Sequence, residues 1–272
     1  MSGIRIKDSW RCAKPLKTFW VVYFLVSIGM VGGVVCGFFV LPLIILGSVG
    51  WVPPDLGPRF FAWGVRRLLD VQPWYRGRVA IPLPKHRPLM IVANHRSHLD
   101  MFFLLAQVPG IRVLSKNTLF KVPFLGTMMR ALRQIPVTRH SLESYFEAME
   151  EIKKVLLSGA IVGVFPEMTR CEIGFSGLQK VHHAPFKMAR ETRAWVLPIV
   201  FSGTDRVWPK KEFGIRFGET VRVETLPALK ADDFDSLGSL MKEVVSQMEK
   251  KSIELESEYG SPLISKEATL EI

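Results

Sequence analysis

Residues 19–49 contain no charged side chain over 31 consecutive positions, and this feature constrains the chain more than any other. As one straight helix the stretch would extend about 46 Å, compared with roughly 30 Å for the hydrocarbon core of a bilayer. A helix this long that is apolar all round does not suit a soluble protein. A cleaved signal peptide would have a shorter apolar core followed by a small-residue cleavage site. We therefore expect residues 19–49 to anchor the chain in a membrane.

The path of this segment has two interpretations. Its N-terminal flank has one acid, Asp8, against five basic residues: Arg5, Lys7, Arg11, Lys14 and Lys17. Its C-terminal flank is also basic, and a single span would place one of the two basic flanks outside the cell. Places to bend are offered by Gly29, Gly32, Gly33 and Gly37, followed by Pro42. A re-entrant segment would keep both flanks at the cytoplasmic face of the inner (cell) membrane, where we expect the chain to lie; the single span is the alternative.

Residues 56–71 are expected to form an amphipathic helix in the membrane interface. Large apolar side chains, among them Phe60, Phe61 and Trp63, would enter the lipid, while three arginines would face its phosphates. The alternative is an ordinary surface helix packed on the core. We accordingly divide the chain into an N-terminal anchor with this helix, residues 1–75, and a second domain, residues 76–272.

The net charge of +11 is unevenly distributed along the chain. Residues 229–272 hold 5 basic and 10 acidic residues, which leaves +16 on residues 1–228. A basic body favours an anionic partner, and beside a membrane segment we expect an anionic membrane surface and lipid phosphate, with no nucleic acid. The acidic end is expected to solvate the last helix. The cysteines form no CxxC pair, which favours a reducing, cytosol-facing compartment.

From residue 77 onward, short apolar runs alternate with segments of helical period. Strands are expected at 88–94, 111–115, 133–137, 160–166 and 194–203, and helices at 101–108, 124–132, 141–157 and from 237 onward. Residues 213–224 alternate like a hairpin with a turn near Gly218–Glu219. Buried strands separated by helices favour an α/β domain. We expect a mixed, largely parallel sheet of about seven strands, covered by helices on both faces.

Polar residues follow four of these strands, at the point where each strand ends. They are His95, Arg139, Glu167 with Arg170, and the residues 202–204. Ligands of α/β sheets bind outside the carboxyl ends of the strands. We therefore expect these polar groups to converge on one site.

His95 and Asp100 stand five residues apart in the stretch NHRSHLD. In one interpretation Asp100 only caps the helix that follows, by accepting a backbone N–H of its first turn. In the other, Asp100 orients His95 and His95 accepts a proton, for which neutral imidazole is suited near pH 7. The two roles are compatible.

These motifs resemble, in order and spacing, the glycerolipid acyltransferase family. The family's first motif, Asn-His followed by four residues and Asp, is matched at 94–100. Its second motif carries an arginine with a lysine upstream, matched by Arg139 and Lys116. Its third motif, Phe-Pro-Glu-Gly-Thr-Arg-Ser, is matched by FPEMTRC at 165–171, and its fourth is an apolar strand with a proline, here Pro198.

The resemblance implies a glycerol-3-phosphate acyltransferase-like fold and a membrane-bound enzyme. Such an enzyme transfers a fatty acyl group from acyl-CoA or acyl carrier protein to the free hydroxyl of lysophosphatidic acid, giving phosphatidic acid. It implies that His95 is the general base, that Asp100 orients it, and that no cofactor is needed beyond the acyl donor. The substrate-binding residues that it implies are Lys116, Arg139, Glu167, Thr169 and Arg170, with Glu167 orienting Arg170 or a loop amide.

The match departs from the family at positions that bear on the acceptor. Met168 stands where the family has glycine, which permits a positive φ or a close approach of the backbone to a ligand. A different lysolipid, such as a lyso-ornithine lipid or another lysophospholipid, is therefore a second hypothesis, and an idle membrane lipid-binding protein is a third. A metal site that adds His98, His182 and His183 to the motif lacks the spacing of known ligand sets, so no metal is expected.

Overall fold

The computed structural model describes residues 39–53, 55–70, 81–122, 125–138, 141–212, 214–216, 219–257 and 264–265, with residues 19, 22, 23 and 26. Of the expected anchor, residues 19–49, the structure describes 39–49 and the four single positions. Within the described part of the chain, no helix combines the length and apolarity needed to cross a membrane.

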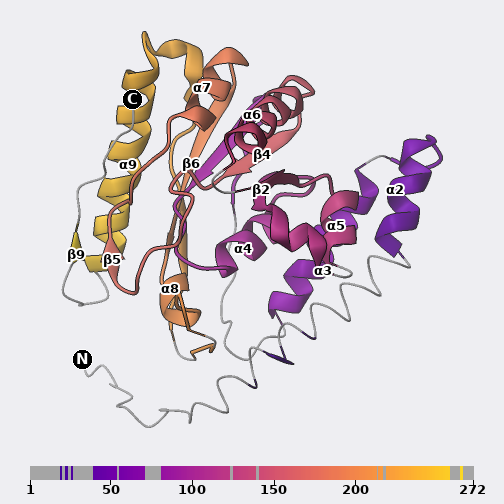
Figure 1. The fold of residues 1–272 in the computed structure, drawn as a ribbon, viewed down its shortest axis with the longest axis horizontal. Coiled ribbons are helices and arrows are strands. Elements are labelled where there is room, and N and C mark those ends of the chain that lie inside the picture. The colour runs from indigo at the N-terminus through magenta and orange to yellow at the C-terminus, as the bar shows by residue number, and fades with distance from the viewer. Residues whose placement is uncertain are drawn as a thin grey trace.

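A mixed, largely parallel sheet forms the centre of the molecule (Figure 1). Its described strands are β1 Leu89–Ala93, β2 Arg112–Lys116, β3 Ile135–Val137, β4 Ile161–Val164, β6 Trp195–Ser202, β7 Arg222–Thr225 and β8 Leu229–Lys230. Their order is β3-β2-β4-β1-β6-β7, with β8 also paired to β6. The ladders from β3 to β6 are parallel, and β7 and β8 run antiparallel to β6. The prediction of a mixed sheet of about seven strands is confirmed.

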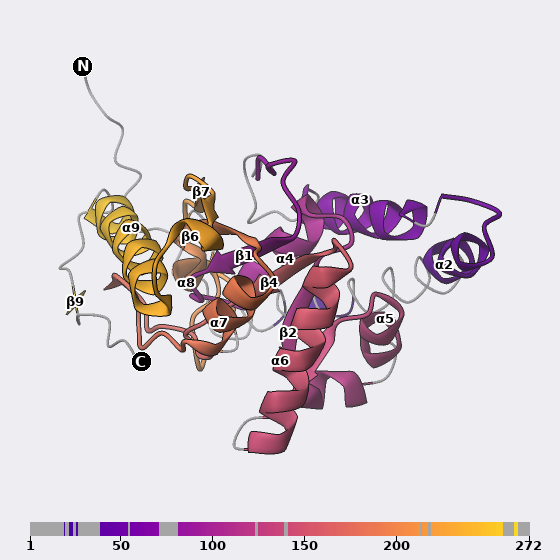
Figure 2. The ribbon, with the colours of Figure 1, turned by 90° about the horizontal axis from the view of Figure 1, so that it is seen from above.

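Helices cover both faces of this sheet. They are α2 Leu41–Ser48, α3 Leu56–Asp70, α4 Leu99–Gln107, η2 Asn117–Lys121, α5 Leu125–Ala131, α6 Leu142–Leu157, α7 Ala184–Glu191, α8 Thr204–Val207, η3 Ala231–Asp233 and α9 Leu237–Ser257. A short pair of strands, β5 Phe175–Ser176 and β9 Ile264–Ser265, lies apart from the main sheet. Figure 2 shows α3 and α6 on opposite sides of the sheet.

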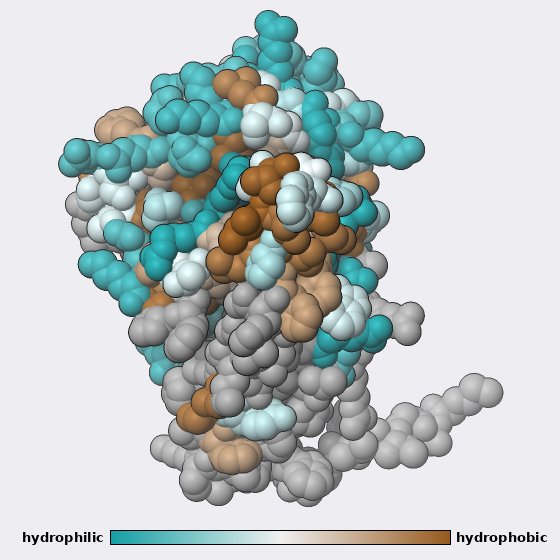
Figure 3. Space-filling model, turned by 90° about the vertical axis from the view of Figure 1, so that its right-hand side faces the viewer, coloured by the Kyte–Doolittle hydropathy of each residue, from teal (hydrophilic) through white to brown (hydrophobic). Residues whose placement is uncertain are grey.

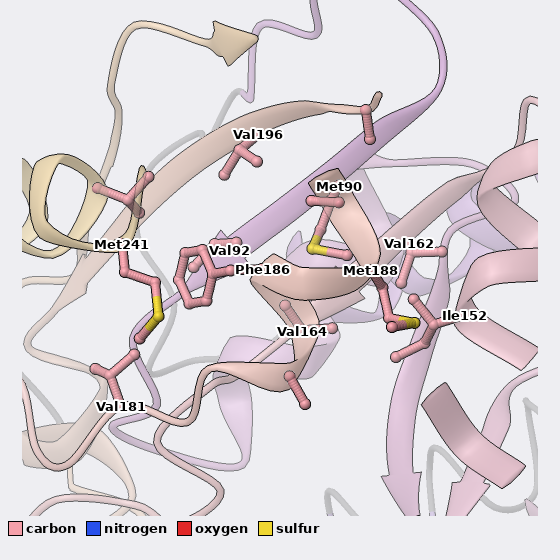
Figure 4. Packing of buried hydrophobic residues seen from close by; sticks show 14 of the residues in the cluster. Met90, Val92, Ile152, Val162, Val164, Val181, Phe186, Met188, Val196 and Met241 are labelled. Carbon is pink, nitrogen blue, oxygen red and sulfur yellow. The ribbon is translucent and has the colours of Figure 1, made fainter. Parts of the chain in front are cut away.

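The alternation of side chains along β1 divides the core in two. Leu89, Ile91 and Ala93 pack with α3 and α4, whereas Met90 and Val92 pack with α6, α7 and α9. All five residues are buried, as expected of a central parallel strand covered on both faces. Figure 4 shows the second cluster, with Phe186 of α7 between Val92 and Met241 of α9.

Two sequence predictions about surface elements need correction. The expected hairpin around Gly218–Glu219 is absent from the described residues, because 214–216 form no strand and β7 pairs with β6 instead. In the helix expected at 141–157, the helical spacing of Leu142, Tyr145, Phe146 and Met149 predicts one apolar stripe from Leu142 onward, yet Leu142 and Phe146 are exposed and the buried face of α6 begins at Ala148.

Helix α3 has the boundaries that its sequence predicts and an arrangement closer to the alternative interpretation. Phe61, Val65 and Leu69 are buried in the core cluster that α3 forms with α4. A β-carbon added to Gly57 would lie 2.7 Å from Ile44 Cγ1, so glycine lets α3 approach α2 closely. Trp63 is exposed on the outer face. The helix thus packs on the core and leaves only part of its apolar surface uncovered.

The same substitution at a buried and at an exposed phenylalanine tests how much burial contributes to stability. We expect Phe186→Ala to lower the free energy of unfolding by about 3–5 kcal/mol, because Phe186 is fully buried and its removal leaves a cavity. Phe146→Ala removes a ring that is 65% exposed, so this substitution should change the free energy of unfolding by less than about 0.5 kcal/mol. Urea denaturation in detergent measures both values. Equal losses in the two variants would contradict the described core.

Candidate active site

The carboxyl ends of three neighbouring strands meet at one edge of the sheet. The order β4-β1-β6 places the loop at 94–98 between the loop at 165–171 and the residues 202–204. The side chain of Asn94 joins β1 to β6 beyond the ladder: its Nδ2 donates to the Phe201 carbonyl (2.9 Å), and its Oδ1 accepts from the Phe201 N–H (2.7 Å). Three of the four predicted strand ends therefore converge. At the fourth strand end, that of β3, the structure describes the chain up to residue 138, and Arg139 lies outside the described residues.

His95 and Asp100 are in direct contact. The Nδ1 atom of His95 lies 3.0 Å from Oδ2 of Asp100. The imidazole ring stacks on Phe165 with 4.4 Å between ring centroids, and its side chain is 19% exposed whereas that of Asp100 is fully buried. The ring is thus held at one nitrogen and on one face.

Asp100 does not occupy the N-cap position of α4. That position is held by His98, whose side chain makes no capping hydrogen bond. Oδ2 of Asp100 instead accepts the backbone N–H groups of Arg96 and Ser97, both at 2.7 Å. Its Oδ1 accepts from the hydroxyl of Thr204 at 2.6 Å. The carboxylate therefore orders the loop before α4 and faces His95 at the same time.

The loop at 165–171 holds the backbone of His95 from the other side. Oε1 of Glu167 accepts the His95 N–H at 2.8 Å, and the Cys171 N–H donates to the His95 carbonyl at 3.0 Å. Oε2 of Glu167 accepts the Gln179 N–H at 2.8 Å. Burial raises the pKa of Glu167, and these two amides oppose that shift. Since both oxygens meet backbone donors, Glu167 orders two loops, as the loop-amide interpretation expects, and its contacts do not indicate substrate binding.

The remaining predicted residues lie at the same edge. Thr169 and Arg170 are half-buried in the loop that holds His95. Arg170 is close enough to His98 to help lower its pKa to about 4, after desolvation as the main cause. Lys116 ends β2, exposed and two strands away from β1, which corresponds to about 10 Å. No cluster of three potential metal ligands occurs among the described residues.

Met168 adopts a backbone conformation that favours glycine. Its φ is +55°, in the left-handed region, and the family's usual glycine would adopt it without strain. The neighbouring departure, Cys171, is buried, and burial raises the pKa of its thiol, so it is not activated as a nucleophile. Thr204, which binds Asp100, was among the polar residues expected at the strand ends, but its sequence position predicted no specific role for it.

Comparisons with known proteins relate the chain to acyltransferases. Residues 78–202 match the family model described as Acyltransferase. The chain is similar to the chloroplastic 1-acyl-sn-glycerol-3-phosphate acyltransferase LPAT1 of Arabidopsis thaliana, with 29% identity over 192 residues, 68% of this chain and 53% of that protein. It is also similar to the 1-acyl-sn-glycerol-3-phosphate acyltransferase of Pseudomonas aeruginosa, with 28% identity over 64% of this chain and 65% of that protein.

The fold is that of a solved structure. The crystal structure of the 1-acyl-sn-glycerophosphate (LPA) acyltransferase PlsC from Thermotoga maritima matches 90% of this chain and 96% of its own, with a TM-score of 0.72 and 22% identity. The chain spans about half the length of the Arabidopsis relative. Together these matches place an acyltransferase-family domain at residues 78–202.

Proposed function

We propose that this protein transfers a fatty acyl group from an acyl thioester, acyl-CoA or acyl carrier protein, to the free hydroxyl of lysophosphatidic acid. The product is phosphatidic acid. The observation that carries the proposal is the pair of His95 and buried Asp100 at the carboxyl edge of the sheet, with 3.0 Å between Nδ1 and Oδ2. The names of the similar proteins support the choice of reaction.

The geometry of the pair suits a general base. With its proton on Nδ1 and shared with Asp100, His95 has a free lone pair on Nε2. Nε2 takes the proton of the acceptor hydroxyl while the oxygen attacks the thioester carbonyl carbon. The tetrahedral intermediate then expels the thiolate, which takes the proton back from the imidazolium. Asp100 stabilises the imidazolium between these steps, and the acceptor hydroxyl replaces the serine of a hydrolase triad.

The acceptor phosphate needs fixed positive donors near this pair. Arg170 is the first of them, because it lies in the loop that also holds the His95 backbone. Arginine can bind phosphate with two parallel hydrogen bonds. Thr169 in the same loop offers a hydroxyl donor, and Lys116 and Arg139 are the further cations of the proposed site.

We also propose that residues 19–49 hold the enzyme in the membrane. The part of this segment that the structure describes includes α2, an apolar helix whose eight residues are all at least partly exposed. Phe39, Ile45, Val49 and the adjacent Trp51 are exposed as well, with Trp51 at 80%. Figure 3 shows hydrophobic side chains gathered on the face of the molecule where α2 and α5 lie. Exposed apolar surface of this kind marks an interaction site, and lipid is the partner that a charge-free segment fits.

A second acceptor is favoured by one observation, the methionine at position 168. Its side chain adds bulk to the loop that carries Thr169 and Arg170, at a position where the family has none. A lysolipid with another head group, such as a lyso-ornithine lipid, is therefore the second candidate. The catalytic steps at the hydroxyl are the same for both acceptors.

His95→Ala tests the reaction and the base together. We expect wild-type protein in detergent micelles to acylate lysophosphatidic acid with an oleoyl thioester, and the variant to lose about 10²-fold to 10⁴-fold in kcat, because the substitution removes the proposed general base. Release of the free thiol measures turnover. Assays with both CoA and carrier-protein thioesters identify the donor.

The matched control for this variant is His86→Ala. His86 is exposed before β1, at the opposite end of the strand, where its ring stacks on Trp195. It should keep wild-type turnover. Folded wild-type protein that turns over none of a panel of lysolipids with either donor would refute the proposed reaction and favour an idle lipid-binding protein.

Substitutions at position 168 test the strained loop and the acceptor. We expect Met168→Gly to be more stable than Met168→Ala by about 0.5–1 kcal/mol. Alanine keeps the strain of the left-handed conformation and glycine removes it, and the larger conformational entropy of glycine in the unfolded chain offsets part of this gain. Urea denaturation measures the difference. If the second acceptor is correct, Met168→Gly should also shift turnover towards lysophosphatidic acid. An alanine variant as stable as the glycine variant would show that φ at this position carries no strain.

Extraction from membranes tests the anchor. We expect the full chain to stay in the membrane pellet in alkaline carbonate and in high salt, and to be released by detergent, since apolar insertion does not depend on charge. Release by high salt alone would show that the basic body binds lipid electrostatically and that residues 19–49 do not insert.

A further inference from the structure

A buried network of charges begins at the residue after His95. Arg96 is 1% exposed, and a buried charge is costly unless it is paired and fully hydrogen-bonded. Its Nε donates to Oδ1 of Asp205 at 2.8 Å, and its Nη2 donates to Oδ2 of Asp205 at 3.2 Å and to the Phe175 carbonyl at 2.8 Å. The same Nη2 lies 3.0 Å from Oε1 of Glu256. The guanidinium is thus paired with two carboxylates.

The network reaches the C-terminal end of α9 through Glu256. This carboxylate is also 1% exposed, and it accepts the Ser202 hydroxyl at 2.6 Å and Nη2 of Arg206 at 2.8 Å. The acidic end of the chain was expected to solvate the last helix, and Glu256 is an exception to that prediction. Two arginines and two carboxylates balance in charge and join the end of β6, α8 and the last turn of α9 to the loop after β1.

The network meets the candidate active site at one peptide group. The backbone N–H of Arg96 donates to Oδ2 of Asp100, the oxygen that faces His95. Asp205 directly follows Thr204, whose hydroxyl binds the other oxygen of Asp100. Asp205 also accepts the Gly174 N–H at 2.9 Å, which fixes the segment that follows the loop at 165–171. The side chains of Arg96 and Asp205 therefore fix two backbone segments that orient Asp100.

We propose that Arg96, Asp205 and Glu256 are positioning residues for the His95–Asp100 pair, so that the last turn of α9 takes part in catalysis without touching substrate. This inference rests on the proposed acyl transfer. A buried ion pair adds little net stability compared with an apolar replacement, so stability alone does not account for three buried charges beside the base. A displacement of about 1 Å at the reacting groups, in contrast, costs roughly 10²-fold in rate.

Glu256→Gln is the first test, with Glu254→Gln as its matched control. Glutamine keeps the shape of Glu256 and removes the charge that pairs with Arg96 and Arg206. Glu254 lies two residues earlier on α9, exposed and paired with Lys251 at 2.8 Å. We expect Glu256→Gln to lower kcat roughly 10-fold to 100-fold with KM within about 3-fold of wild type, and Glu254→Gln to change neither.

A spectroscopic signal separates positioning from a merely structural role. In ¹⁵N-histidine-labelled protein, the His95 resonance, assigned by its loss in His95→Ala, should report Nδ1 protonated in wild type and a mixture of tautomers in Glu256→Gln. This signal does not depend on turnover. If wild type turns over no lysolipid, the proposed function fails, while an altered tautomer in Glu256→Gln still supports the positioning role.

A charge-balanced variant covers the case in which Glu256→Gln does not fold. Arg206→Gln combined with Glu256→Gln removes one charge of each sign and leaves Arg96 paired with Asp205. We expect this variant to fold, as judged by circular dichroism, and to keep the low kcat. Wild-type kcat and an unchanged His95 signal in either folded variant would overturn the proposal.

Discussion

The buried carboxylate of Asp100 is the interaction on which the arrangement of the site depends. A charged group without water needs hydrogen-bond donors on all sides, because an unpaired buried charge costs several kcal/mol. Asp100 meets the ring of His95, two backbone N–H groups of the same loop and the hydroxyl of Thr204. These donors come from two strand ends that only the folded sheet brings together. The hydrogen bonds of Asp100 can therefore form only when the ends of β1 and β6 are paired in the sheet.

Strands β1, β4 and β6 were predictable because they are buried on both faces. A strand such as β1, with five consecutive buried residues, appears in the sequence as a short apolar run with turn residues around it. The hairpin prediction failed because it used a local sequence pattern, whereas the conformation of this segment depends on contacts with distant parts of the chain. Ile215 is fully buried, and the Arg216 N–H donates to the Val207 carbonyl, so this segment packs back on α8 instead of pairing with β7. Alternation in a sequence cannot distinguish such packing from a strand.

The site was predictable to the extent that its residues belong to short sequence motifs. His95, Asp100 and Glu167 stand at fixed spacings after apolar strands, and the structure brings all three into one hydrogen-bonded loop system. Arg96 and Glu256 are 160 positions apart, and no local pattern connects them. Glu256 stands in a charged run that resembles a solvated helix end, and only the packing of α9 against the end of β6 shows that it is buried.

One loop supports both halves of the proposed reaction. The residues 165–171 hold the backbone of His95 at its N–H and its carbonyl, and they also carry Thr169 and Arg170. Met168 stands between the residue that holds the base and the residues proposed to bind the phosphate, in a left-handed conformation. A loop clamped at both ends cannot absorb a change at its centre by moving as a whole. In the proposed reaction, selection of the acceptor and alignment of the base would therefore be coupled through this loop, whose Glu167 and Cys171 both contact the backbone of His95.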